Sequence, residues 1–183
     1  MDLNFLILDI KRDFFNMTDI DITRNILYLT GDITESTVPY FISRVNYLVE
    51  ENKDREILVY INSYGGDMYS AFGIIDYMRV CEVKIGVSCY GAAMSASALI
   101  LINATGEKIM SKNSYLMFHP PWINEDEDLD ENHMKDLKNK ILDNIVEHSN
   151  KGKRFWSNKL KNDYYINARE CLNLGLIHRV LSY

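Results

Sequence analysis

Residues 87–103 read Val-Ser-Cys-Tyr-Gly-Ala-Ala-Met-Ser-Ala-Ser-Ala-Leu-Ile-Leu-Ile-Asn, and they decide the fold. An apolar, strand-like segment passes through Gly91 and small residues into an apolar, helix-like segment. The Ser95 hydroxyl is therefore predicted to lie where a strand turns into a helix. A serine at such a corner is exposed, and the backbone N–H groups after it can bind a developing oxyanion. Small residues also let a buried helix pack close to a sheet, so this stretch alone leaves both interpretations open.

The segments before this stretch alternate between strand and helix patterns. They are a strand at 24–29, a helix at 38–49, a strand at 56–61, a helix at 68–79 and a strand at 83–89. A third helix is predicted to follow, ending at about Ala104. This alternation is typical of a right-handed βαβ succession with a mainly parallel sheet. The nearly continuous apolar run at 56–61 suits a strand covered on both faces.

The second half of the chain carries shorter elements. Strands are predicted at 108–110, at 115–118 and at 176–181, and an amphipathic helix from about Met134. Residues 167–170, Asn-Ala-Arg-Glu, resemble a capping box that opens a short helix ending at Gly175. The acidic residues 125–131 predict a solvated loop or flap. Residues 1–23 have no clear period and are interpreted as an arm outside the core.

Composition limits the classes of protein to consider. The 183 residues suffice for one domain spanning 1–183, and 47% hydrophobic residues suit a packed core. A net charge of −6 argues against nucleic acid as the main partner. No apolar run reaches the roughly 18 residues of a membrane span. Three cysteines without CxxC spacing are interpreted as reduced core residues (Cys81, Cys89 and Cys171), so we expect a cytoplasmic protein, in the host cytoplasm if the gene is viral.

A serine nucleophile needs a base, usually an imidazole oriented by a carboxylate. Of the four histidines, His119 alone directly follows a strand, held between Phe118 and Pro120-Pro121. His148 shares a helix face with apolar residues and is interpreted as structural. His133 lies beside the acidic run, and His178 inside the predicted last strand. Asp163 is one of several candidate carboxylates, and local sequence does not choose among them.

The pair Gly65-Gly66 follows a predicted strand and leads into a helix. Glycine allows close approach of the backbone to a ligand, so these N–H groups could form an oxyanion hole or simply a tight turn. The loop lacks GxGxxG, and no Lys-Ser/Thr follows it, which excludes the dinucleotide and phosphate-loop patterns. The acidic run has no central glycine and no EF-hand spacing. No cofactor or metal is therefore expected.

Four segments together resemble the proteolytic subunit of the Clp protease. They are Leu58-Val-Tyr-Ile-Asn-Ser-Tyr-Gly-Gly66, Gly91-Ala-Ala-Met-Ser-Ala96, Leu116-Met-Phe-His-Pro-Pro121 and Asp163-Tyr-Tyr-Ile-Asn-Ala-Arg-Glu-Cys-Leu-Asn-Leu-Gly-Leu-Ile177. The resemblance covers residues 25–180 and keeps the order of the family's motifs. It implies the Clp/crotonase type of α/β fold, a spiral of βαβ units with a handle helix in the region of about 122–150.

The same resemblance implies an ATP-dependent serine endopeptidase without a cofactor of its own. Ser95 would be the nucleophile, His119 the base and Asp163 the residue orienting it, with the N–H groups of Gly66 and Ala96 as the oxyanion hole. Ser97 is the rival nucleophile, and the motif register selects Ser95. The implied partners are copies of the chain in a heptamer or tetradecamer, an AAA+ unfoldase, and unfolded polypeptides as substrates.

The chain departs from the family pattern in places. Tyr64 replaces a proline, Met94 a smaller or aromatic residue and Asn162 an arginine, while Trp122 to Asp128 replace a glycine-rich strand. These changes, with the poorly matching arm, motivate an alternative: a weakly active or non-proteolytic subunit that modulates a host Clp ring. A crotonase-like acyl-CoA enzyme is a third hypothesis, but its carboxylates and coenzyme pocket are not visible.

Overall fold

The structure is a computed structural model that describes residues 19–120 and 130–181. The expectations for residues 1–18 and for most of the acidic run lie outside these residues, as does the departure at 122–128. The described strands are β1 (Ile20–Asp21), β2 (Ile26–Thr30), β3 (Ile57–Ser63), β4 (Ile85–Met94), β5 (Lys108–Ser111), β6 (Tyr115–Phe118), β7 (Tyr164–Asn167) and β8 (Arg179–Leu181). The described helices are α2 (Thr37–Glu51), α3 (Met68–Val80), α4 (Ala96–Ile102), α5 (Glu131–Glu147), α6 (Lys153–Lys159) and α7 (Ala168–Asn173).

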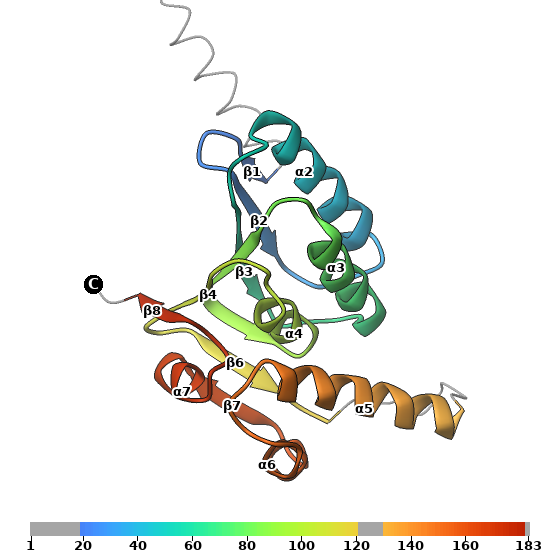
Figure 1. Ribbon diagram of the computed structural model, residues 1–183. Coiled ribbons are helices and arrows are strands. Elements are labelled where there is room, and N and C mark those ends of the chain that lie inside the picture. Colours follow the sequence, from blue (N-terminus) through green and yellow to red (C-terminus); the bar gives the residue numbers. More distant parts are fainter. Residues whose placement is uncertain (1–18, 121–129, 182–183) are drawn as a thin grey trace, which may run out of the picture.

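The centre of the sheet confirms the predicted βαβ succession. Strands β2, β3, β4 and β5 lie side by side and parallel, each joined to the next through a helix. Helices α2, α3 and α4 pack along one face of these strands (Figure 1). α4 is apolar except for Ser97 and is completely buried, as a helix must be when it packs in the middle of the core.

Strand β4 is longer than the sequence predicted, because it continues through Gly91 to Met94. Gly91 has φ of +94°, a conformation that only glycine adopts easily, so the chain can turn without ending the strand. The first half of β4 pairs with β5, and the second half, from Ala92, pairs with β6. The helix therefore begins only at Ala96, immediately after Ser95.

A second, smaller layer is built on the end of β4. β6 pairs in parallel with β4 and in antiparallel with β7, which leads into α7. The Asn167 side chain accepts the Glu170 N–H at 3.0 Å, which confirms the predicted cap of this helix. α5 and α6 lie beside this layer (Figure 1). Neither β7 nor α6 was predicted as an element, because both are short and α6 buries only Trp156 completely.

Three expectations about the boundaries of the core are wrong. Residues 19–23 of the supposed arm belong to the core, since Ile20 and Ile22 are buried and β1 pairs with β2. Strand β3 is covered fully on one face only: Tyr60 is half-buried and Asn62 exposed on the other. The last strand begins at Arg179, so His178 lies just before it rather than inside it.

A polar network joins the end of α5 to the core and contains a histidine held neutral. His148 Nε2 lies 2.9 Å from Asn103 Oδ1, and its Nδ1 lies 3.3 Å from Lys108 Nζ. The amide oxygen can only accept and the ammonium can only donate, so the neutral ring with its proton on Nε2 satisfies both. Burial, with the nearby Lys108 ammonium, lowers the pKa of His148 to about 4. Arg79 also lowers this pKa, and Glu147 raises it.

We therefore expect the protein to lose stability as the pH falls from about 6.5 towards 4. In this window the unfolded chain protonates His148 while the folded chain keeps it neutral, so acid favours unfolding. Thermal unfolding midpoints measured between pH 4 and 7 check this. The variant His148→Gln cannot titrate, and its midpoint should depend less steeply on pH over that range. An equally steep dependence in this variant would assign the effect to other groups.

Candidate active site

Ser95 stands at the turn between β4 and α4 in an unusual backbone conformation. Its φ of 54° and ψ of −123° are rare for a residue with a side chain. Its N–H donates to the Met117 carbonyl at 2.8 Å, and its carbonyl accepts from the first turn of α4. These bonds hold the strained turn in place, so the half-buried hydroxyl is presented at the end of the strand.

His119 reaches this hydroxyl from the neighbouring strand. Met117 of β6 pairs with Met94 of β4, so the chain passes beside Ser95 and His119 follows two residues later. His119 Nε2 lies 2.7 Å from Ser95 Oγ. On the other side of the ring, Nδ1 lies 2.5 Å from the Pro120 carbonyl oxygen. Because that oxygen can only accept, the proton belongs on Nδ1, and Nε2 is the nitrogen that can accept the proton of Ser95.

Asp163 immediately precedes β7, opposite the end of β6. The last pair of the antiparallel ladder is Phe118 with Tyr164, and one further step would place Asp163 across from His119. Side chains of directly opposed residues lie on the same face, with Cβ atoms roughly 5 Å apart. Asp163 is exposed. The register thus places Asp163 one step beyond the last ladder pair, on the strand that faces His119, while the ring nitrogen Nδ1 lies against the Pro120 carbonyl.

The glycine loop packs directly against the Ser95 turn. A Cβ on Gly65 would lie 2.6 Å from the Met94 carbonyl oxygen and 2.8 Å from Ser95 Cβ, so only glycine fits. Gly66 forms an isolated parallel β-bridge with Ile33, which lies in the segment after β2. The Ile33 N–H donates to the Gly65 carbonyl, and the Ile33 carbonyl accepts the Asp67 N–H. In a parallel bridge of this kind, the N–H of Gly66 itself points away from Ile33, towards the β4 side.

Ala96 contributes the second predicted N–H. It is the first residue of α4, and the first N–H groups of a helix have no acceptor within it. In the part of the chain that the structure describes, neither the Gly66 nor the Ala96 N–H donates to a protein acceptor. Both donors therefore remain available on the side of the Ser95 turn.

Ser97, the rival nucleophile, has a different environment. It is completely buried, and its Oγ lies 2.8 Å from the Ser63 carbonyl and 2.7 Å from the Met94 carbonyl, which share its one proton, while it accepts the Met94 N–H at 2.8 Å. This hydroxyl ties the loop after β3 to the Ser95 turn. Sequence reasoning missed this role and that of Asn62, whose Oδ1 accepts the Ala92 N–H at 3.1 Å. Both residues lie within the quoted motifs, which was the available signal.

The remaining histidines lie elsewhere. His133 stacks on Tyr69, whose hydroxyl lies 2.5 Å from its Nε2. His178 Nδ1 accepts the Lys108 N–H at 3.3 Å, and His148 belongs to the polar network described above.

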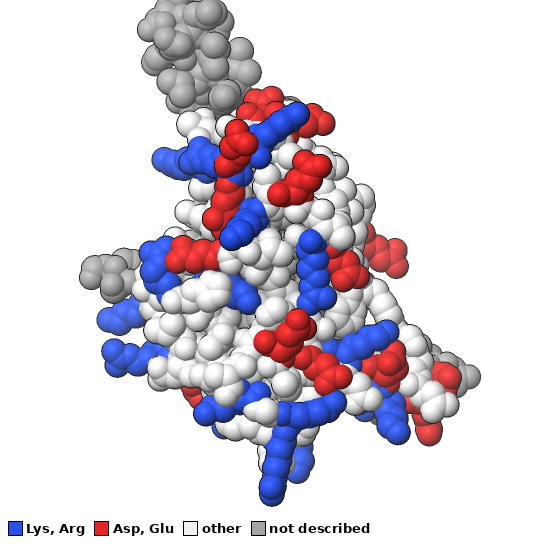
Figure 2. All heavy atoms as spheres, in the orientation of Figure 1, with Lys and Arg blue, Asp and Glu red and all other residues white. Residues whose placement is uncertain are grey.

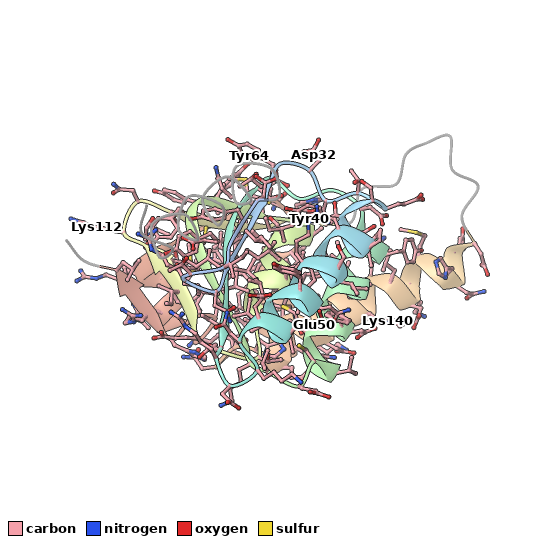
Figure 3. The ribbon with its side chains drawn as sticks, turned by 90° about the horizontal axis from the view of Figure 1, so that it is seen from above. Asp32, Tyr40, Glu50, Tyr64, Lys112 and Lys140 are labelled. Atoms are coloured by element: carbon pink, nitrogen blue, oxygen red, sulfur yellow. The ribbon has the colours of Figure 1, made fainter. Side chains whose placement is uncertain are left out.

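In Figure 3, Tyr64 and Asp32 mark one edge of the molecule, where β3 and β2 end, and Glu50 lies at the opposite end of α2. Tyr64 is 75% exposed directly before Gly65.

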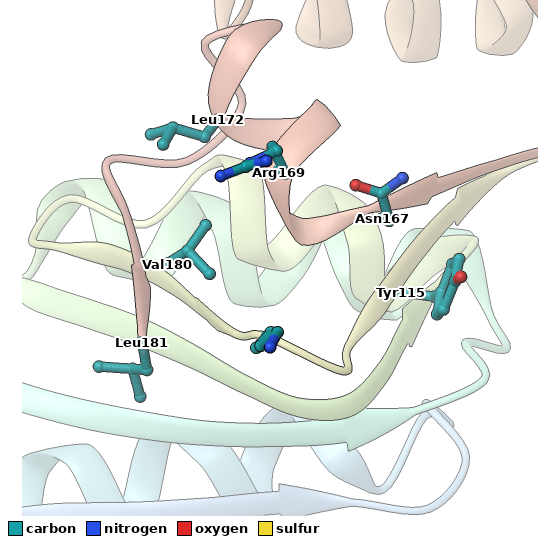
Figure 4. A pocket seen from close by; sticks show the side chains of 7 residues that line it. Tyr115, Asn167, Arg169, Leu172, Val180 and Leu181 are labelled. Carbon is teal, nitrogen blue, oxygen red and sulfur yellow. The ribbon is translucent and has the colours of Figure 1, made fainter. Parts of the chain in front are cut away.

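A cavity of about 730 Å³ lies at the other end of β6. Its lining residues are Lys112, Tyr115, Asn167, Arg169, Leu172, Val180 and Leu181 (Figure 4). Tyr115 is four residues before His119, a distance of roughly 13 Å along a strand. The cavity is therefore separate from the Ser95–His119 pair.

Residues 19–120 and 130–181 contain neither a cluster of metal ligands nor a membrane-spanning helix. No group of three His, Cys, Asp or Glu side chains there is arranged to hold a metal ion. None of the helices there is long and apolar enough to cross a membrane.

The fold and the pair of side chains define a class: an α/β protein with a serine at a strand-to-helix turn and a histidine within hydrogen-bond distance. The family model for the Clp protease matches residues 11–183, and the chain belongs to this family. Its mixed α/β architecture is that of the Clp protease fold. Membership makes the chain a ClpP-type peptidase, a hydrolase, and implies an oligomeric partnership of the Clp type in general.

Proposed function

We propose that this protein is a serine endopeptidase that hydrolyses unfolded polypeptides inside an oligomeric chamber, as the proteolytic subunit of an ATP-dependent Clp-type protease. The observation that carries the proposal is the distance of 2.7 Å between Ser95 Oγ and His119 Nε2 at a strained strand-to-helix turn. The expected location is the cytoplasm, or the host cytoplasm if the gene is viral.

In the proposed mechanism, His119 Nε2 removes the Ser95 proton as Oγ attacks the peptide carbonyl. The imidazolium then gives this proton to the leaving amine, and an acyl-enzyme remains on Ser95. Water, deprotonated by the same nitrogen, attacks the acyl carbonyl and releases the second product. The Pro120 carbonyl supports this cycle because it holds the ring in the tautomer whose Nε2 is a base.

The Gly66 and Ala96 N–H groups are the proposed oxyanion hole. They lie on the two segments that Gly65 packs together, the loop after β3 and the start of α4. Donors fixed in this way stabilise the tetrahedral intermediate without having to reorganise, and one such donor typically contributes about 10²–10³ in rate. The close packing of Gly65 supports the assignment because it fixes the spacing of the two donors.

Asp163 is proposed to stabilise the imidazolium form of His119. We expect Asp163→Asn to lower kcat for a fluorogenic peptide by about 10²–10⁴-fold, because an amide cannot balance the developing positive charge. The matched control is Asp32→Asn, another exposed acid that follows a strand, which should leave kcat unchanged. Equal rates for Asp163→Asn and the wild type would show that groups other than Asp163, such as the Pro120 carbonyl, orient His119.

An aromatic groove on the open face of the sheet supports the proposed unfoldase partnership. Its lining includes Tyr28, Tyr60 and Tyr90. The ring centroid of Tyr60 lies 5.3 Å from that of Tyr28 and 5.1 Å from that of Tyr90. Tyr90 is 40% exposed. Exposed aromatic rings that cluster on a surface are typical of sites that bind another protein.

Peptide and protein hydrolysis by the assembled oligomer test the proposed function. We expect the oligomer alone to cleave a short fluorogenic peptide, and a tightly folded protein only after adding an AAA+ unfoldase and ATP. A permanently unfolded, alkylated protein should be cleaved without ATP more readily than the folded one. If a correctly assembled oligomer cleaves none of these, the non-proteolytic ring subunit becomes the better description.

A further inference from the structure

The cavity at the start of β6 is separate from the sites described above. Its volume of about 730 Å³ lies within the range of about 300–1,000 Å³ that is typical of small-molecule sites, so a short peptide would fit. Neither Ser95 nor His119 lines it, and among the described residues none lines both this cavity and the aromatic groove. Its walls carry three kinds of side chain: polar, apolar and cationic.

The end of the β6–β7 ladder forms a polar wall. Tyr115 and Asn167 are directly opposed in this antiparallel pair, so their side chains lie on the same face of the sheet. Asn167 Oδ1 accepts the Glu170 N–H, whereas its Nδ2 has no acceptor among the described residues. The Tyr115 side chain is 48% exposed. An amide that donates and a hydroxyl that donates or accepts suit the N–H and C=O groups of a peptide backbone.

Helix α7 and strand β8 form an apolar wall. Leu172 of α7 is 41% exposed, and Val180 and Leu181 of β8 are half-buried. Figure 4 shows these three side chains on the side of the cavity away from Tyr115 and Asn167. A ligand that covers apolar surface gains about 25 cal/mol per Å² removed from water. This wall therefore favours a ligand with an apolar body.

Two cations complete the lining. Arg169 lies three residues before Leu172 on α7, and Lys112 lies in the turn between β5 and β6. Both are exposed, and no carboxylate in residues 19–120 or 130–181 forms an ion pair with either. Figure 2 shows several Lys and Arg side chains on the side of the molecule where Figure 1 places α7 and β8. A guanidinium can hold both oxygens of a carboxylate, so these cations favour an organic acid.

We propose that this cavity binds the free C-terminal carboxylate of a short apolar peptide. The carboxylate pairs with Arg169 and Lys112, and the last side chain of the peptide covers Leu172. The preceding backbone amide faces Asn167 and Tyr115. A fatty acid has the same charge and an apolar chain, but it would leave the polar wall without a partner, so the peptide is favoured. The site goes beyond the proposed function and does not depend on it, although peptide hydrolysis would release ligands of this kind.

Isothermal titration calorimetry with N-acetylated trileucine tests the site. The protein is the full chain with Ser95→Ala, so that the peptide stays intact whether or not the wild type hydrolyses it. We expect saturable binding of the free acid. The same peptide with a C-terminal amide should bind at least about tenfold more weakly, because it lacks the charge that the two cations recognise. Decanoate, titrated in the same way, should bind more weakly than the peptide acid.

Variants in the same background locate the binding. Lys112→Gln/Arg169→Gln should raise Kd for the peptide acid at least about tenfold. Leu172→Ser should raise it at least about threefold, because less apolar surface is covered. The matched control is Arg154→Gln/Lys161→Gln, which removes the same two charges from exposed residues that do not line the cavity. This control should leave Kd unchanged.

Several outcomes would overturn the peptide site. They are no saturable binding of the acid, equal Kd for acid and amide, and unchanged Kd in the Lys112→Gln/Arg169→Gln variant. Tighter binding of decanoate than of the peptide would assign the cavity to a fatty acid instead. A change in the oligomer mass of the folded cavity variant, measured by sedimentation velocity, would show that a second copy of the chain covers the cavity. Fluorophosphonate labelling of the wild type reports on the proposed function separately, since an unlabelled Ser95 leaves the peptide-binding result valid.

Discussion

Ser95→Ala is expected to lower kcat for a short fluorogenic peptide by about 10⁴-fold or more, with KM little changed. The hydroxyl 2.7 Å from His119 is the proposed nucleophile, and no covalent intermediate can form without it. Removing the nucleophile of a serine hydrolase leaves only the rate enhancement of the oxyanion hole and substrate binding. Steady-state kinetics at matched oligomer concentration checks this.

The control is Ser43→Ala, an exposed serine on α2, which should keep full activity. Ser97→Ala separates catalysis from architecture. Its Oγ lies within hydrogen-bond distance of three backbone groups in a buried site, so we expect a loss of about 1–3 kcal/mol in unfolding free energy while Ser95 still reacts. Activity retained by Ser95→Ala and lost completely in a folded Ser97→Ala variant would contradict the assignment.

Gly65→Ala is expected to have the second-largest effect. The added Cβ would lie 2.6 Å from the Met94 carbonyl oxygen and 2.8 Å from Ser95 Cβ, in a residue with φ of +104°. Backbone atoms on both sides must move, which shifts the Ser95 turn relative to the glycine loop. A displacement of about 1 Å at a reacting group can cost about 10² in rate, so we expect kcat to fall by at least that factor. The unfolding free energy should fall by about 3 kcal/mol.

Gly31→Ala is the matched control for this variant. Gly31 also has a positive φ, of +81°, but a Cβ there would meet no atom within 4 Å. It should show only the backbone strain of about 1 kcal/mol and keep full activity. Equal kcat for the two alanine variants would show that the close packing of Gly65 on the Ser95 turn does not matter for catalysis.

The central fold could be predicted because its signals are local. Apolar runs at β2, β3 and β4 separated by helical patterns indicate a parallel sheet, and the structure confirms it. The continuation of β4 beyond Gly91 was not predictable, because it depends on pairing with β6, whose residues follow 23 positions later. Likewise, Ile20 appeared to belong to an arm because its burial comes from strands elsewhere in the chain.

The candidate site shows the same division. The ends of strands made Ser95 and His119 candidates, the resemblance to the Clp protease assigned their roles, and the structure brings them to 2.7 Å. Local sequence could not choose Asp163 among the acids, and only the resemblance named it, because its place near the end of β6 depends on the antiparallel register of β6 with β7. The group that fixes the tautomer of His119 is the backbone carbonyl of Pro120, and the sequence cannot indicate it because every residue has a carbonyl. Only the folded backbone shows it.

Mass spectrometry of the assembled protein after treatment with a fluorophosphonate tests the central claim most directly. Only a serine activated by a base reacts readily with this reagent, so the expected result is one adduct per chain, on the peptide that contains Ser95. The adduct should be absent in a folded His119→Ala variant, because the base is missing. An adduct on Ser97 or another residue, or no adduct on a correctly assembled wild-type oligomer, would contradict the claim that Ser95 is an active nucleophile.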